Sequence, residues 1–487
     1  MLFSSMIFLW IFLPVVIIGN LAIGFMPFKT KHDVIRAKNI FLLASSFVFY
    51  AWGGIYYLFI MISCICINYF GGIAISKTDK NKKQVLIAII VANLLILFVF
   101  KYFNMIIIII ENILQPKKGS IIGMRRTGLF SIKEIVLPIG ISFFTFQAMS
   151  YVVDVYKSKA EVQKNIFDFA LYVSFFPQLI AGPIVKYSDI SAQIKSRVET
   201  PELILSGIKR FCYGMGKKII LSNTFAEVAD KIWASDIATI RGAVAWLAVI
   251  TYTLQIYFDF SGYSDMAIGL GRIFGFEFKE NFNYPYTSLS IQEFWRRWHI
   301  SLSSWFKEYV YIPLGGNRKG PRRTLLNLFI VFMLTGIWHG ANFTFIAWGM
   351  YYGILLIIER VFLGKILEKN PVKIINFTYT MFLVMIGWIF FRSNNIFQAV
   401  DIIKGLFMPG NADGAVLSFI SMRLLICLVF GILFCGPVQR LLGGVYEKIA
   451  EKRWVENLDF AFQMFLLCVS IMMLVSGTYN PFIYFQF

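Results

Sequence analysis

The chain has 487 residues, of which 58% are hydrophobic and only 15% charged, with a mean hydropathy of +0.69. A soluble chain of this length would need far more charge to cover its surface, so a soluble globular protein is excluded. The net charge of +19 lies in short basic stretches between apolar runs, as the positive-inside rule produces. Contact with anionic membrane lipids explains this charge, and nucleic-acid binding is not expected.

Apolar runs long enough to cross a bilayer recur along the chain. They occupy residues 6–26, 85–100, 243–258, 374–391, 424–434 with its flanks, and 460–475. The first run has no small-residue cleavage site after it, so we expect a retained helix. We therefore predict an all-α, multi-pass protein of the cell (cytoplasmic) membrane with roughly a dozen spans. No long linker divides it, which indicates one membrane domain over 1–475 and an aromatic tail over 476–487.

Two apolar segments, residues 137–144 and 175–183, carry proline and glycine in their middle. Within a bilayer, a broken helix is tolerated only where protein or a water-filled cavity satisfies the freed backbone groups. We therefore expect re-entrant pieces that line a cavity. A plain kinked helix is the alternative.

Cysteine and histidine usage gives no metal signature. The six cysteines fall almost entirely within apolar runs, without ligand-like spacing, and are expected to be small buried hydrophobes. Of the three histidines, His32 lies in a basic loop, whereas His299 and His339 lie in the two most unusual segments. Two histidines without a nearby third ligand do not make a metal site, so none is predicted.

The aromatic run 257–265 contains two acids and two serines. An acid at the end of a span is costly unless it is paired or faces water. Asp259 and Asp265 therefore either orient neighbouring helices or take a direct chemical role. We retain Asp259 and Ser261 as candidate substrate-binding residues.

Residues 293–306 read EFWRRWHISLSSWF. At helical spacing the large aromatic side chains cluster toward one side: Trp295, Trp298, Trp305 and Phe306. Arg296 and Arg297 turn away, which predicts an in-plane amphipathic helix with its indoles at headgroup depth. His299 is placed beside the aromatic face.

A further histidine lies inside a span that begins at Leu325. About fourteen apolar residues precede His339, so its imidazole should sit well below the membrane surface. Gly336 and Gly340 thin the helix, so that a substrate or another backbone can approach. A desolvated imidazole stays neutral and can take the proton of a hydroxyl that attacks a thioester. A core histidine with satisfied hydrogen bonds is the alternative.

These segments together resemble the membrane-bound O-acyltransferase family, and within it the bacterial branch typified by the alginate O-acetyltransferase membrane subunit. The matching stretches are 257–265, 293–306, 311–318, 336–342 and 388–392, with weaker similarity from residue 137 onward. The resemblance implies about eleven spans around a funnel, plus re-entrant and interfacial helices. Two cavities from opposite faces should meet at a histidine, and an acyl thioester donor such as acetyl-CoA should enter from the cytoplasm.

By this resemblance His339 matches the catalytic histidine and His299 the second motif histidine. The residues around these histidines are then expected to contact substrate: Arg297, Trp298, Trp338 and Asn342. The C-terminal residues 480–487, NPFIYFQF, resemble the tail of a small membrane peptide of the D-alanylation system, in which a tyrosine is thought to carry the acyl group. Tyr484 would then be an acyl relay within this chain, and an interfacial aromatic anchor is the alternative.

The resemblance implies an O-acyltransferase that exports acetyl groups for the O-acetylation of an extracellular or cell-wall polysaccharide. No Gly-x-Ser-x-Gly motif is present, so a separate extracytoplasmic SGNH-hydrolase-like acyltransferase is the expected partner. A D-alanyl exporter with a carrier-protein donor is one alternative. A non-enzymatic transporter, in which the polar centre only lines a pathway, is another.

Overall fold

The computed structural model describes residues 1–115, 129–130, 135–410, 415–477 and 479–483. Within these ranges every regular element is a helix, which confirms the all-α prediction. Among the described residues, seven helices are long and apolar enough to cross a membrane, or eight if one bent pair counts as a single span. This is fewer than the eleven or so that we expected, because several helices of the described core are shorter or carry more polar residues than a simple span.

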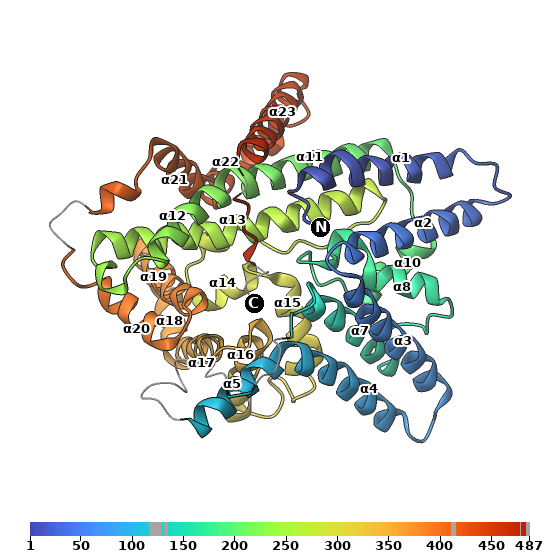
Figure 1. The fold of residues 1–487 in the computed structure, drawn as a ribbon, viewed down its shortest axis with the longest axis horizontal. Coiled ribbons are helices and arrows are strands. Elements are labelled where there is room, and N and C mark those ends of the chain that lie inside the picture. The colour runs from blue at the N-terminus through green and yellow to red at the C-terminus, as the bar shows by residue number, and fades with distance from the viewer. Residues whose placement is uncertain (116–128, 131–134, 411–414, 478, 484–487) are drawn as a thin grey trace.

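The first half of the chain supplies the helices drawn from blue to green in Figure 1. They are α1 (Leu13–Gly24), α2 (Lys31–Ala51), α3 (Ile55–Lys77), α4 (Lys82–Leu97), α5 (Phe103–Leu114), α7 (Ile141–Tyr156), α8 (Ile166–Ser174), α9 (Phe176–Leu179), α10 (Tyr187–Lys195), α11 (Pro201–Met215) and α12 (Asn223–Trp233). A π-helical turn, Phe98–Tyr102, joins α4 to α5, so that Lys82–Leu114 forms one candidate span.

The second half begins with the longest helix and closes the ring of helices seen in Figure 1. Its members are α13 (Ala243–Ile273), α14 (Ile291–Arg297), α15 (Ile300–Phe306), α16 (Pro321–His339), α17 (Phe343–Ile358), α18 (Gly364–Lys369), α19 (Lys373–Arg392), α20 (Ile396–Gly405), α21 (Met422–Phe434), α22 (Pro437–Ile449) and α23 (Arg453–Ser476). From α23 the described chain turns back toward the middle of the molecule.

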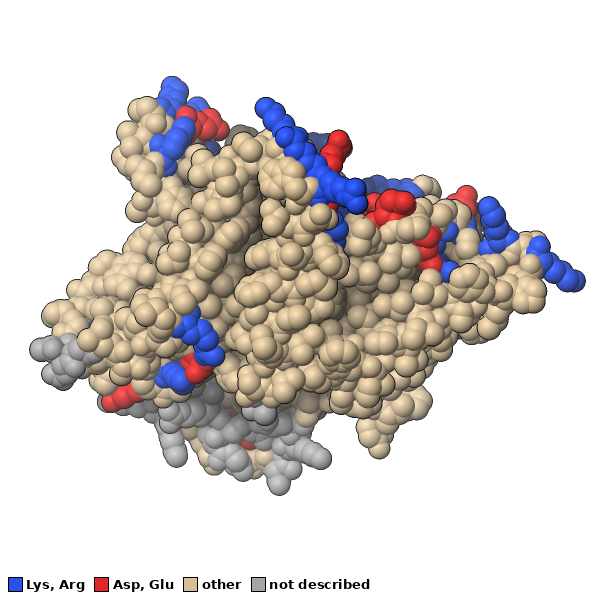
Figure 2. All heavy atoms as spheres, turned by 90° about the horizontal axis from the view of Figure 1, so that it is seen from above, with Lys and Arg blue, Asp and Glu red and all other residues tan. Residues whose placement is uncertain are grey.

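The surface agrees with a membrane setting. Figure 2 shows a face that is a broad expanse of uncharged residues, with Lys, Arg, Asp and Glu gathered mostly along its upper edge. Large apolar side chains are exposed along the outer helices, such as Ile18 at 66% and Val475 at 68%. Such exposure would be unfavourable in water but is what lipid-facing helices require.

The helix that carries His339 packs closely on the next one. An added Cβ at Gly336 would lie 2.3 Å from the carbonyl oxygen of Phe345, and one at Gly349 would lie 2.5 Å from that of Phe332. The missing side chains let the backbones of α16 and α17 touch. Of the two possibilities considered for Gly336, the structure therefore shows the approach of another backbone.

The two proline- and glycine-containing segments pack against each other. Helix α7 starts only at Ile141, after Gly140 in a left-handed conformation (φ +75°). A Cβ at Gly140 would lie 2.6 Å from the carbonyl oxygen of Leu179, which ends α9. Both segments thus interrupt regular helix inside the protein, where a broken helix is tolerated.

The prediction of an in-plane interfacial helix over residues 293–306 is wrong. The segment forms two short helices, α14 and α15, separated by Trp298 and His299, of which His299 has a left-handed conformation (φ +45°). The aromatic side chains predicted to lie at headgroup depth are all buried: Trp295, Trp298, Trp305 and Phe306. An aromatic helix face suits a protein interior as well as a membrane interface, and here neighbouring helices cover it.

Candidate active site

His339 is the last residue of α16, which ends because Gly340 adopts an extended conformation (φ −171°, ψ 160°). Its ring is buried among aromatic rings, with centroids 5.0 Å from Trp338, 5.1 Å from Trp348 and 5.0 Å from Phe391. Nδ1 has no hydrogen-bond partner in the described part of the chain. This differs from a core histidine with satisfied nitrogens, because buried polar atoms normally find partners.

His339 lies in the walls of two cavities. The larger, of about 250 Å³, is lined by Lys101, residues 136–143, Ile180, Trp338 and His339. The smaller, of about 10 Å³, is lined by Ile256, Phe260, Trp298, His339, Trp348, Trp388, Phe391 and Ile483. His339 is the residue common to both linings. The broken segment before α7 lines the larger cavity, as predicted from its proline and glycine.

Two residues that the sequence analysis missed cap the end of α16. The ammonium of Lys101 donates to the carbonyl oxygen of Trp338 and to Ser142 Oγ, the latter at 3.3 Å, and the hydroxyl of Tyr102 donates to the carbonyl oxygen of Ile337. The last carbonyls of a helix lack partners within the helix and favour a nearby cation. The sequence does carry a signal here, because Lys101 is a charged residue near the middle of the candidate span Lys82–Leu114.

His299 is held by a buried polar cluster at the junction of α14 and α15. Its Nδ1 lies 3.1 Å from Asn281 Oδ1, which also accepts from the Ser301 N–H at 3.2 Å and from Ser301 Oγ at 2.9 Å. An oxygen that serves as acceptor for these donors requires His299 Nδ1 to carry the hydrogen. In the neutral ring Nε2 then carries the free lone pair, and within the described residues Nε2 has no hydrogen-bond partner.

Asp259 is part of a buried ion pair that holds the C-terminal segment. Lys218 Nζ lies 2.6 Å from Asp259 Oδ1, and both side chains are almost fully buried. The Ile483 N–H donates to Asp259 Oδ2 at 2.8 Å, and the carbonyl oxygen of Pro481 accepts from Lys218 Nζ. The acid and its partner lysine thus contact the tail backbone at two points.

Further contacts fix the tail on the same path. Asn480 Nδ2 donates to the Ser4 carbonyl oxygen at 2.8 Å, and the Phe482 ring lies 4.8 Å from that of Tyr263. Phe482 and Ile483 are 3% and 2% exposed. An interfacial anchor is therefore wrong for residues 480–483, because they enter the protein core. Tyr484 lies outside the described residues, and Ile483 before it lines the small cavity beside His339.

Of the expected substrate-contacting residues, Trp298 and Trp338 line the cavities and the others do not. Arg297 forms an ion pair with Glu293 at 2.8 Å. Asn342 caps α17 by accepting from the Thr344 N–H at 3.1 Å. Ser261 is buried within α13. Through residue 483, and leaving aside the undescribed segments, no three His, Cys, Asp or Glu side chains are grouped so as to hold a metal ion.

Comparison with known proteins decides the family. The sequence model of the membrane-bound O-acyltransferase family matches residues 46–397. The chain belongs to this family. A membrane-bound O-acyltransferase is an enzyme, so the alternative of a non-enzymatic transporter is set aside. The protein is thus a multi-pass membrane O-acyltransferase.

Three relatives show where the chain stands within the family. A probable alginate O-acetylase of Pseudomonas putida is 37% identical, with both chains covered over 100% of their length. A peptidoglycan O-acetyltransferase of Helicobacter pylori is 35% identical over 83% of this chain and 80% of its own. A teichoic acid D-alanyltransferase of Bacillus subtilis is 29% identical over only 46% of this chain and 59% of its own.

Proposed function

We propose that this protein takes an acetyl group from a cytoplasmic acyl thioester, such as acetyl-CoA, and passes it across the cytoplasmic membrane for O-acetylation of an extracellular or cell-wall polysaccharide. The support is that relatives similar over most of their length are named for the acetylation of alginate and peptidoglycan. The D-alanyltransferase match covers less than half of the chain, so D-alanyl export is the weaker alternative.

The observation that carries the mechanism is the position of His339 in the walls of two cavities. The larger cavity offers room for the thioester end of a donor. The smaller has space for about one water molecule and is lined by Ile483, the residue before Tyr484.

In the proposed reaction the Tyr484 phenol attacks the thioester carbonyl carbon while neutral His339 accepts the phenol proton. The carbon–sulfur bond then breaks, and the leaving thiolate takes that proton from His339. The products are an acetyl-tyrosine and a free thiol. A phenyl ester is more activated than an alkyl ester, so an SGNH-hydrolase-like partner outside the cytoplasm can pass the acetyl group on to a sugar hydroxyl.

The test is intact-mass analysis of the C-terminal peptide after the purified protein is incubated with acetyl-CoA or with a D-alanyl-loaded carrier protein. We expect an acetyl adduct on Tyr484 that is lost in His339→Ala and Tyr484→Phe but kept in the control Tyr446→Phe, which changes an exposed tyrosine on α22. An adduct formed only from the carrier protein would favour the D-alanyl exporter. A wild-type protein that acetylates glycan without any adduct would overturn the relay.

A further inference from the structure

The larger cavity beside His339 is apolar except for a few groups. Among its described lining residues, Lys101 and His339 are the side chains that can carry a charge. Lys101 has no carboxylate within ion-pair distance in the described ranges, unlike the buried Lys218. A buried cation without a counter-ion is unfavourable, so such a residue inside a span is a functional candidate by default.

The hydrogen bonds of Lys101 leave capacity for a ligand. An ammonium has three N–H donors, and two acceptors are found for them, the Trp338 carbonyl oxygen and Ser142 Oγ. The hydrogen bond to the Trp338 carbonyl oxygen holds the Lys101 ammonium beside Trp338, the residue before His339. The cation is thus held in the same cavity as the imidazole.

We propose that the Lys101 ammonium stabilises the oxyanion formed on the donor carbonyl during acyl transfer. This rests on the proposed function. When the phenol oxygen bonds to the carbonyl carbon, the π electrons of the C=O bond move to oxygen and leave a negative charge there. Lys101 donates its remaining N–H to that oxygen. The charge returns to re-form the C=O bond as the carbon–sulfur bond breaks, so Lys101 neither gains nor loses a proton.

A purely structural role for Lys101 makes a different prediction. Lys101 and Tyr102 both cap the last carbonyls of α16, and a cap requires a hydrogen-bond donor but no charge. Lys101→Gln keeps a donor and removes the charge, whereas Lys101→Met removes both. Tyr102→Phe removes the neighbouring cap without changing charge, and so measures what capping alone contributes.

The experiment compares the rate of acyl-enzyme formation and the KM for acetyl-CoA in these variants. We expect Lys101→Met, which removes the oxyanion donor, to lower the rate by roughly 10²- to 10³-fold with little change in KM. Lys101→Gln, which keeps a donor without the charge, should lower the rate less than Lys101→Met but clearly more than Tyr102→Phe. Tyr102→Phe should lower the rate of acyl-enzyme formation far less. A Lys101→Gln enzyme as fast as Tyr102→Phe would overturn the proposal. Failure of the proposed function would give a different result, namely an acetyl-tyrosine adduct that still forms in His339→Ala.

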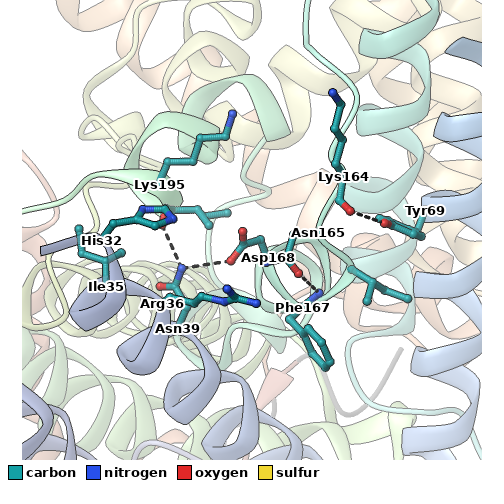
Figure 3. A pocket seen from close by; sticks show the side chains of 12 residues that line it. His32, Ile35, Arg36, Asn39, Tyr69, Lys164, Asn165, Phe167, Asp168 and Lys195 are labelled. Carbon is teal, nitrogen blue, oxygen red and sulfur yellow. Dashed lines mark hydrogen bonds between the residues drawn. The ribbon is translucent and has the colours of Figure 1, made fainter. Parts of the chain in front are cut away.

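An independent observation concerns the pocket of about 430 Å³ between the start of α2, the start of α8 and the end of α10, shown in Figure 3. Four basic side chains line it: His32, Arg36, Lys164 and Lys195. None has an ion-pair partner in the part of the chain that the structure describes. The one acid in the lining, Asp168, already accepts from Asn39 Nδ2 at 3.2 Å.

The pocket lies at the end of membrane-crossing helices. Its α2 residues belong to the first turns of a candidate span, and Tyr69 lies near the end of the span α3. Figure 3 shows Lys164 and Lys195 on opposite sides of the pocket with their ammonium groups extended the same way, and Arg36 below them in this view. The exposed Phe167 ring borders the same pocket. We infer that this pocket binds a phosphate group at the depth of lipid headgroups.

The source of the phosphate can be tested with the full chain in nanodiscs. We expect the wild type to retain phosphatidylglycerol over phosphatidylcholine in native mass spectrometry, and the triple variant Arg36→Gln/Lys164→Gln/Lys195→Gln to lose this preference. The matched control replaces three exposed lysines elsewhere, Lys365, Lys369 and Lys373.

Displacement of the lipid by inorganic phosphate would support the phosphate site and identify a soluble phosphate as its ligand. Persistence of the lipid in phosphate would identify the lipid headgroup. An equal loss of lipid preference in both triple variants would overturn the site.

Discussion

The buried pair between Lys218 and Asp259 should decide whether the C-terminal tail stays docked. Lys218→Met removes the cation 2.6 Å from Asp259 Oδ1 and also the donor to the Pro481 carbonyl oxygen. It leaves Asp259 charged and buried, with the Ile483 N–H as its remaining described partner. The perturbation thus acts at the site where the tail backbone is held.

The expected loss of docking free energy follows from the burial of the Lys218–Asp259 pair. Removing one partner of a buried ion pair costs about 3–5 kcal/mol, and about 1.4 kcal/mol corresponds to a tenfold change in an equilibrium constant. If this cost falls on tail docking, the docking equilibrium weakens by roughly 10²- to 10⁴-fold. The matched control is Lys231→Met, which breaks an exposed i,i+4 pair with Glu227 worth only about 0.3–0.5 kcal/mol.

The assay is hydrogen exchange of the C-terminal peptide, read at the Ile483 amide, together with the yield of acetyl-tyrosine. In Lys218→Met we expect faster exchange and a lower yield, because an undocked tail no longer reaches the small cavity. Lys231→Met should match the wild type in the rate of exchange and in the yield of acetyl-tyrosine. Unchanged exchange in Lys218→Met would refute the reasoning, since it would mean that the tail is held without the ion pair.

Two further changes test packing and charge away from the chemistry. Gly336→Ala places a Cβ 2.3 Å from the Phe345 carbonyl oxygen and should destabilise the α16–α17 pair by about 1–3 kcal/mol, seen as a lower thermal midpoint in detergent. Gly443→Ala meets nothing within 4 Å in α22 and should not destabilise. Asp265→Asn removes the carboxylate that pairs with Lys217 at 2.6 Å and with Arg210 at 2.7 Å, and Arg210 keeps its second partner, Glu280. We expect a lower thermal midpoint but normal transfer per folded molecule, and a selective loss of transfer would contradict this structural role.

Several features could be predicted from the sequence because they depend on local composition. Apolar runs predict membrane helices, since the transfer free energy of a segment is a property of that segment. The broken segment 137–144 was predicted to line a cavity, and it does. His339 was singled out as an ionisable group within an apolar segment, and the structure places it in the linings of two cavities. Its helix α16 is not among the candidate spans of the described residues.

The failures have a common physical cause. The aromatic face of residues 293–306 was assigned to the membrane interface, but a helix face carries no information about whether lipid or protein covers it. Lys101 was passed over because its role depends on the end of α16, which is far along the chain. In both cases the deciding partner comes from a distant segment.

The sequence alone therefore determined that this is a helical membrane protein with histidine-bearing segments suited to acyl transfer. Only the tertiary structure decided which groups stand beside those histidines. Asp259 meets Lys218 and the Ile483 backbone, the latter 224 residues away, and the tail is thereby led into the core. Such pairings arise from how whole helices pack, since a buried charge is stable only where the fold brings it a partner.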